Sequence, residues 1–215
     1  MTDEQLRGDA EDELHWEPRI DNRAIAVSAA DGIVTLRGTV GSFREKREAE
    51  SAVKRVYGTK GVENKLEVRL LNEDRRNDAE LRADVLQALM LDSLVPDTVD
   101  AKVDDGNVLL TGTAKHQHER SEAAYVAGNV KGVIWVQNDI ALAVETPKPA
   151  DVQDAITKAF ERDAKIDATR VSVDSNNGTV RLSGAVQSWA EHDAAVNAAW
   201  AAPGVEDVED RIEIV

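Results

Sequence analysis

The feature that most constrains this chain of 215 residues is a glycine-framed segment that occurs three times. It reads GIVTLRG over residues 32–38, GNVLLTG over 106–112 and GTVRLSG over 178–184. Other residues keep a fixed distance from the second glycine in every copy. They are Glu45, Glu119 and Glu191; Gly58, Gly132 and Gly204; Val62, Val136 and Val208; and Asn64, Asn138 and Asp210. So many shared offsets show that the chain is an internal repeat.

The offsets between copies are 74 and then 72 residues, too long for the usual solenoid unit of about 20–50 residues. Each copy is instead long enough to be a small domain with its own core. The segments between copies are polar, or rich in proline as in Glu145–Pro149, which is typical of linkers. We therefore predict three modules: residues 1–72, 73–144 and 145–215.

Within a copy, the spacing of apolar residues changes from helical to alternating and back. A first helix is predicted from residues four apart, an Asp-Gly or Asn-Gly hairpin joins two alternating strands, and an alanine-rich second helix precedes a last strand. The first-helix stripes are Leu6, Ala10 and Leu14; Leu81, Val85 and Leu89; and Val152, Ile156 and Phe160. The predicted fold class is α+β: three tandem α-β-β-α-β modules, each a small three-stranded mixed sheet with two helices packed on one face.

The repeated glycines are predicted to be structural. The first closes the hairpin, the second allows close packing, and the third ends the second helix in a left-handed conformation. They are Gly32, Gly38 and Gly58; Gly106, Gly112 and Gly132; and Gly178, Gly184 and Gly204. A phosphate-binding loop is disfavoured, because no Lys-Ser or Lys-Thr follows and the first glycine does not open a helix.

Three motifs accompany this order of elements: the Asp-Gly or Asn-Gly turn, the Val-x-Leu-x-Gly strand, and a Gly-Val-x-x-Val-x-Asn segment that is best preserved in Gly132–Asn138. In this order and in these motifs, the chain resembles the BON family. The name refers to bacterial osmotically inducible and nodulation proteins. The resemblance covers nearly the whole chain. It implies an association with envelope or osmotic stress and, as proposed for the module, binding to phospholipid or a membrane surface.

The composition limits the location and the partners. The net charge is −15, divided as −2, −6 and −7 among the three modules, so nucleic acid is not an expected partner. There is no cysteine, no apolar stretch long enough to cross a bilayer, and no basic leader followed by an apolar run at the N-terminus. These features lead us to expect an acidic protein of the cytoplasm.

No set of residues predicts catalysis. His116 and His118 could hold a metal ion, but the other copies place Ser42 and Arg44, or Ser188 and Ala190, at those positions. The repeated glutamates Glu45, Glu119 and Glu191 are predicted to complement the dipole of the second helix. We expect no enzyme activity, no cofactor and no metal site, and His192 has no visible partner.

The first module differs from the others by a basic second helix beside an aromatic residue that we expect to be exposed. This candidate surface for anionic lipid or a protein partner consists of Phe43, Arg44, Lys46, Arg47, Lys54 and Arg55, with Trp189 as the aligned aromatic of module three. Alternatively, these cations pair along the helix or with the acidic surface of modules two and three. Trp135 and Trp200 have no aligned aromatic counterpart, so they mark contacts between modules or are ordinary core or edge residues.

The function expected from these features is a non-catalytic, stress-associated binding or scaffold protein of BON type, which docks on a phospholipid surface or a protein partner. The alternative is a sensor of a cation or small ligand in osmotic or ion homeostasis, with its site between modules.

Overall fold

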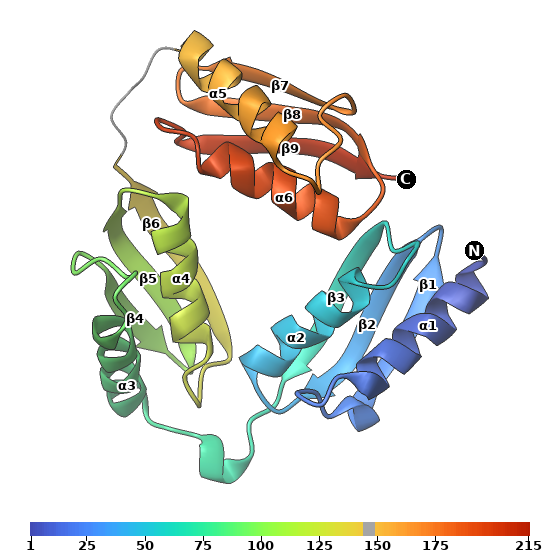
Figure 1. Ribbon diagram of the computed structural model, residues 1–215. Coiled ribbons are helices and arrows are strands. Elements are labelled where there is room, and N and C mark those ends of the chain that lie inside the picture. Colours follow the sequence, from blue (N-terminus) through green and yellow to red (C-terminus); the bar gives the residue numbers. More distant parts are fainter. Residues whose placement is uncertain (144–148) are drawn as a thin grey trace.

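The computed structural model describes residues 1–143 and 149–215 as three α-β-β-α-β modules (Figure 1). Module one contains α1 (Asp3–Trp16), β1 (Ile25–Ala30), β2 (Ile33–Val40), α2 (Phe43–Lys54) and β3 (Gly61–Val68). Module two contains α3 (Asp78–Leu91), β4 (Asp100–Asp104), β5 (Asn107–Ala114), α4 (Gln117–Gly128) and β6 (Trp135–Leu142). Module three contains α5 (Pro149–Arg162), β7 (Val171–Asn176), β8 (Thr179–Val186), α6 (Trp189–Trp200) and β9 (Asp207–Ile214). Single-turn 3-10 helices lie at Asn22–Ala24 and Asn72–Asp74.

Each module has a three-stranded mixed sheet with its second strand in the middle. In module one, β1 and β2 form an antiparallel hairpin in which Val27 faces Leu36, and α2 crosses over so that β3 runs parallel to β2. Modules two and three repeat this pairing. Both helices cover the same face of their sheet (Figure 1), which confirms the predicted fold class.

The core of each module lies between its sheet and its two helices. Alternate residues of β2 point inward, so Val34 and Leu36 are fully buried, and the predicted first-helix stripes are buried in all three modules. The second helices approach the sheet through small side chains such as Ala49 and Ala123, both fully buried. Burying apolar area of this kind contributes about 25 cal/mol per Å², and it explains why each repeat carries its own stripe.

The hairpin turns have the backbone that the sequence predicted. Asp31 and Gly32 both have positive φ, 53° and 80°, as a two-residue type I′ turn requires. The turn is also held from outside: the carboxylate of Asp3, at the start of α1, accepts hydrogen bonds from the backbone N–H groups of both turn residues. Asp78 does the same in module two.

One prediction about the glycines is wrong. Helix α2 ends at Lys54 with Arg55 as its C-cap, so Gly58 lies three residues beyond the cap, in the turn that leads to β3. The last turn of the helix is closed by the bonds from Arg55 N–H to the Ala52 carbonyl and from Val56 N–H to the Val53 carbonyl, so no left-handed residue is needed there. The positive φ of Gly58, 86°, serves the turn instead.

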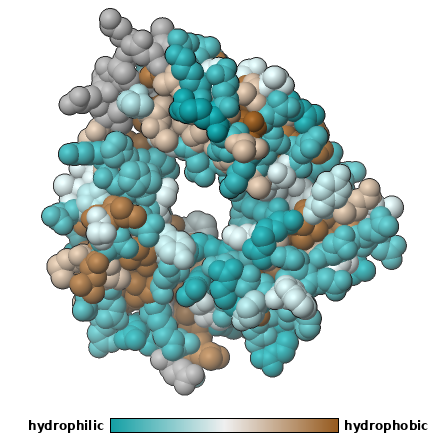
Figure 2. All heavy atoms as spheres, viewed as in Figure 1, coloured by the Kyte–Doolittle hydropathy of each residue, from teal (hydrophilic) through white to brown (hydrophobic). Residues whose placement is uncertain are grey.

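The three modules are arranged in a ring with α2, α4 and α6 on its inner side (Figure 1). Figure 2 shows an opening at the centre of the ring. The two chain ends lie on the same side of the ring, and Met1 and Val215 line one cavity of 590 Å³ where modules one and three meet.

Candidate functional site

Modules one and two meet at the first residue of α2, in a contact that we call joint 1–2. Phe43 is only 8% exposed and belongs to the apolar core of module two. Its ring lies 5.5 Å from that of Trp135 in an edge-to-face arrangement, and it packs over Gly128, the last residue of α4. The expectation that Phe43 is exposed is therefore wrong, because the neighbouring module covers it.

The basic residues next to Phe43 take part in the same joint. The guanidinium of Arg47 donates to the side-chain oxygen of Asn129 at 2.7 Å and lies over the ring of Tyr125, 4.9 Å from its centre. Burial at this position lowers the pKa of Arg47 from its ordinary value. The ammonium of Lys46 lies 5.4 Å from the centre of the Trp135 ring. Trp135 thus marks an inter-module contact, as one of the sequence alternatives proposed.

The other two joints use the same aligned positions, namely the first residue of one second helix and the last residue of another. At joint 3–1, between modules three and one, the first residue of α6 is Trp189, and the ammonium of Lys54, the last residue of α2, lies 4.5 Å from its ring centre. At joint 2–3, between modules two and three, Gln117 begins α4 and Trp200 ends α6, and both line a cavity of 310 Å³. The second helices therefore follow one another head to tail around the ring.

These contacts account for most of the basic surface that the sequence singled out. Lys54 also pairs with Glu50, and Arg55 pairs with Glu13 and Glu17 of α1. Together with the joint contacts, they engage Phe43, Lys46, Arg47, Lys54, Arg55 and Trp189, and leave Arg44 as an exposed member of the set that takes part in none of them. The structure thus favours the alternative in which these residues pair within the chain.

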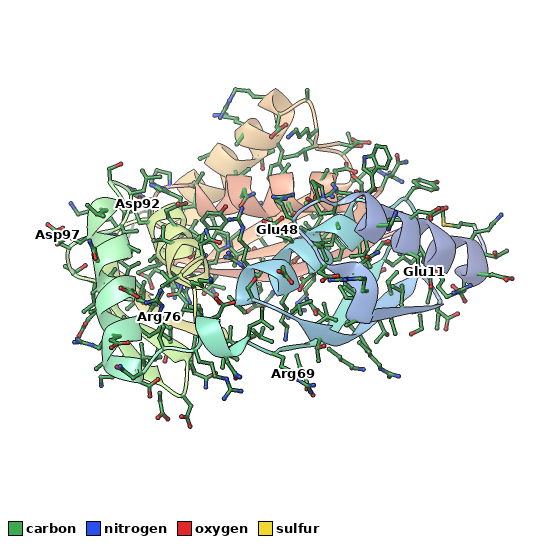
Figure 3. The ribbon with its side chains drawn as sticks, turned by 90° about the horizontal axis from the view of Figure 1, so that it is seen from below. Glu11, Glu48, Arg69, Arg76, Asp92 and Asp97 are labelled. Carbon is green, nitrogen blue, oxygen red and sulfur yellow. The ribbon has the colours of Figure 1, made fainter. Side chains whose placement is uncertain are left out.

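Glu17 is the centre of the ion-pair network at the end of α1. Hydrogen bonds from the Arg19 side chain lower the pKa of Glu17 from 4.5 to about 2, against a burial effect that would raise it. Arg19 also pairs with Glu48 of α2 at 2.9 Å, and Figure 3 shows Glu48 on that helix. The network fixes α1 to α2.

The repeated glutamates accept hydrogen bonds from backbone N–H groups just before each second helix. Glu45 accepts a hydrogen bond from Gly41 N–H, and Glu119 accepts from the N–H groups of Lys115 and His116. Although burial acts in the opposite direction, these backbone donors lower the pKa of Glu119. Glu191 bonds to Gln187 N–H in the same way. They lie in the first turn of each second helix, as predicted, and these hydrogen bonds to the preceding backbone explain why all three copies keep a glutamate.

The asparagine of the last strand ties the second helix to the sheet in modules one and two. Asn64 donates to the Lys46 carbonyl and Asn138 to the Arg120 carbonyl, both at 2.8 Å. Module three has Asp210, whose carboxylate cannot donate, and its partner is the side chain of His192 at 2.7 Å. The statement that His192 lacks a partner is therefore wrong. Comparison of the aligned residues could have found this pair, since both positions change together.

Sequence reasoning also missed an apolar surface at the end of α3, which we call the module-two tip. It consists of Met90, Leu91 and Leu94, which are 77%, 75% and 51% exposed. Figure 3 shows Asp92 and Asp97 at the outer edge of the molecule, in the same segment. A cavity of 340 Å³ lined by Leu94, Val95 and Pro96 adjoins it.

The hydrogen bonds after each first helix show which residues of the other modules correspond to the tip. The N–H groups of Arg19, Leu94 and Lys165 each donate to an acid two residues earlier, so these three residues are equivalent. Module one therefore carries His15, Trp16 and Arg19 at the tip positions, and module three carries Glu161, Arg162 and Lys165. Only module two is apolar at all three. The pattern was readable in the sequence once the helix ends were aligned.

Neither a metal site nor a membrane span is found in the part of the chain that the structure describes. The rings of His116 and His118 stack at 5.3 Å, but no group of three His, Cys, Asp or Glu side chains gathers within residues 1–143 and 149–215. In the same ranges, no helix combines the length and the apolar character that crossing a bilayer requires. Among the described residues, no third ligand joins His116 and His118 to form a metal site.

Comparison with known proteins finds similarity to a curated protein and to solved structures. Osmotically-inducible protein Y of Escherichia coli (strain K12) is 33% identical over 121 residues, which are 54% of this chain and 60% of that protein, so the match spans less than two thirds of the relative's length. Among solved structures, CdsD, a structural protein of the type III secretion system of Chlamydia trachomatis, is 15% identical with a TM-score of 0.28, covering 98% of this chain and 92% of that one. Its C-terminal domain is 14% identical with a TM-score of 0.28, and all of both chains is covered.

A family model described as BON domain matches residues 2–69, 77–143 and 149–215, one match in each module. These three matches include almost every residue of the chain, so the protein belongs to the BON domain family.

Proposed function

We propose that this protein is a stress-associated binding protein that docks on phospholipid surfaces through the module-two tip. The observation that carries the proposal is the exposure of Met90, Leu91 and Leu94, at positions where module three has charged side chains. The stress association is supported by the BON domains and by the similarity to osmotically-inducible protein Y. Docking is a non-catalytic role, and it requires no cofactor.

A lipid surface suits the shape and chemistry of the tip. Met90 and Leu91 are about three quarters exposed and protrude from a helix end, so they are placed to enter an apolar phase. Each CH₂ group that leaves water contributes about 0.8 kcal/mol, so three aliphatic side chains supply useful but reversible binding.

Electrostatics then decide which lipid surface is preferred. The protein carries a net charge of −15, and the basic residues Lys46, Arg47 and Lys54 of α2 are engaged in joints and ion pairs. An anionic surface should therefore repel the protein, and this repulsion acts over a Debye length of about 10 Å at 0.1 M salt. We expect neutral phosphatidylcholine vesicles to bind more protein than anionic vesicles at low salt. In the cytoplasm, the compartment predicted from the sequence, the surface would be an inner leaflet.

The test is sedimentation with phosphatidylcholine vesicles, with and without phosphatidylglycerol. The variant Met90→Glu, Leu91→Arg, Leu94→Lys gives the tip the residues of module three and should abolish binding to neutral vesicles. Arg44→Glu, which changes an exposed basic residue of α2, is the matched control and should bind as the wild type does. If the tip variant sediments as well as the wild type, or if only Arg44→Glu loses binding, the proposal is wrong.

A further inference from the structure

His192 lies between two carboxylates in module three. Its Nε2 is 2.7 Å from Oδ2 of Asp210 on β9, and its Nδ1 is 3.0 Å from Oδ1 of Asp193 on α6. The residue is only 9% exposed. A neutral imidazole carries one N–H group, whereas the imidazolium carries two. Both contacts can therefore be hydrogen bonds only when His192 is protonated.

The His192–Asp210 pair replaces a hydrogen bond that, in modules one and two, does not depend on pH. In modules one and two, an asparagine amide donates to a backbone carbonyl of the second helix, at 2.8 Å in both. An amide donor does not titrate, but the Asp210 carboxylate accepts only, so β9 and α6 depend on a donor from His192. Histidine is the side chain that changes charge between about pH 5 and 8. Module three alone thus carries a titratable connection at this position.

The imidazole of His192 is in contact with Trp189, the residue of module three that forms joint 3–1. Trp189 meets the His192 ring edge-to-face, 4.9 Å between centres, and the ammonium of Lys54 from module one lies 4.5 Å from the centre of the Trp189 ring. A chain of contacts therefore runs from Asp210 through His192 and Trp189 to α2.

The charged groups on the elements around α6 are paired with other residues or are exposed. Asp193 and Asp210 are therefore the partners of the His192 imidazole. Lys54 of α2 faces Trp189 and pairs with Glu50, while Arg181 of β8 pairs with Asp174 and Glu209. Glu191 is committed to the backbone N–H groups of Asp167 and Gln187. Helix α5 contributes buried apolar residues to the core, and its described charged side chains, Asp154, Lys158, Glu161 and Arg162, are exposed.

Joint 3–1 also contains a cavity, lined by Lys60 of module one and Gln187 of module three. Its cavity of 590 Å³ compares with 310 Å³ at joint 2–3, whereas Phe43 fills joint 1–2. The Nε1–H group of Trp189 is buried there without a hydrogen-bond acceptor among the described residues. A single cation–π contact is a weak interaction, so a modest change at His192 can shift this joint.

We propose that His192 is a pH-sensitive latch on joint 3–1. When it is protonated, it bonds to Asp193 and Asp210 and holds Trp189 beneath Lys54, so the ring is closed. When it loses its proton, one of the two carboxylates loses its donor, Trp189 is released, and modules one and three separate. The closed form is present when both contacts of the imidazole are hydrogen bonds, at low pH, and is lost as the pH rises.

The chain has no cysteine, so two engineered cysteines can be spin-labelled without side reactions. Lys60→Cys and Gln187→Cys both line the cavity of joint 3–1, one from each module. Distances between the labels, measured by double electron–electron resonance, should be short and narrowly distributed at pH 5, and longer and broader at pH 8.

The control is Asp210→Asn, which restores the amide of modules one and two and should give the same distances at both pH values. The pair His192→Lys with Asp210→Asn reproduces Lys46 and Asn64 of module one and serves as a second variant with the same expected result. Since His15, His116 and His118 remain in both variants, they control for other histidines. Equal wild-type distances at pH 5 and pH 8, or a pH response that persists in both variants, would overturn the proposal.

Discussion

The ring of Phe43 lies directly against Gly128, the last residue of α4. A Cβ atom on Gly128 would stand 3.0 Å from Cδ1 and Cε1 of that ring and 3.3 Å from the guanidinium carbon of Arg47. The aligned residues are Lys54 in module one and Trp200 in module three, so a large side chain is accommodated at the other two joints. Each joint therefore matches the end of one helix to the beginning of another. The aromatic residue begins its helix at joints 1–2 and 3–1 and ends its helix at joint 2–3.

This complementarity can be tested by moving the pair of joint 2–3 into joint 1–2. Gly128→Trp should destabilise the protein because the indole collides with Phe43, and Phe43→Gln should destabilise it by leaving a cavity. The double variant carries the Gln–Trp combination of joint 2–3. Its loss should be smaller than the sum of the single losses by about 0.5–3 kcal/mol, the range for residues in contact. Urea unfolding of the four proteins gives this coupling, and additive losses would contradict the assignment of the pair.

The ion pair at the end of α1 predicts how stability depends on pH. The pKa of Glu17 is about 2 in the folded protein, below its ordinary value of 4.5. Folding therefore favours the ionised form. Its contribution is complete above about pH 4.5 and is lost as the pH falls towards 2. In Glu17→Gln, the fall in unfolding free energy between these values should be shallower than in the wild type. Arg19→Gln removes the donor and should have the same effect; a slope unchanged in both variants would exclude this role.

Much of the scaffold could be predicted from sequence because it repeats. The turn glycines, the first-helix stripes and the capping glutamates occur three times, so each copy supports the interpretation of the others. The end of the second helix was misplaced, because a glycine with positive φ suits a following turn as well as a helix cap. The joints were not predictable in the same way. Phe43 and Gly128 lie in different modules, and nothing in either module alone indicates which neighbour it faces.

The same distinction applies to the candidate sites. A basic helix beside an aromatic is typical of a lipid-binding surface, yet its residues form contacts whose partners, Trp135 and Asn129, belong to another module. By contrast, the module-two tip and the His192–Asp210 pair were readable from sequence. Each is a departure from the repeat, and alignment of the copies at the helix ends and at the last strand exposes it. Differences between copies therefore identify candidate sites more reliably than the composition of one helix.

The asparagine tie should stabilise module two measurably. In Asn138→Asp, the new carboxylate faces the Arg120 carbonyl. The hydrogen bond of 2.8 Å is then lost, because both groups are acceptors and neither can donate. We expect a loss of about 1–3 kcal/mol, the cost of leaving a partly buried polar group unpaired. Adding Arg120→His to Asn138→Asp reproduces the pair of module three and should recover stability at pH 5 more than at pH 8. Denaturant unfolding at both pH values measures this, and equal recovery at the two would contradict the explanation.

The second glycine of the repeat should be the position least tolerant of change. Gly38 has a φ of 123°, and a Cβ there would stand 1.9 Å from the Ala24 carbonyl oxygen. Positive φ alone costs a non-glycine residue about 1–3 kcal/mol, and the contact with backbone oxygen adds to this, so Gly38→Ala should lose more than that range. Gly8 in α1 is the matched control, because no atom lies within 4 Å of its added Cβ. Since alanine is favoured over glycine inside a helix by about 1 kcal/mol, Gly8→Ala should raise the midpoint of thermal unfolding while Gly38→Ala lowers it. The same direction of change in both variants would show that close packing does not explain the repeated glycine.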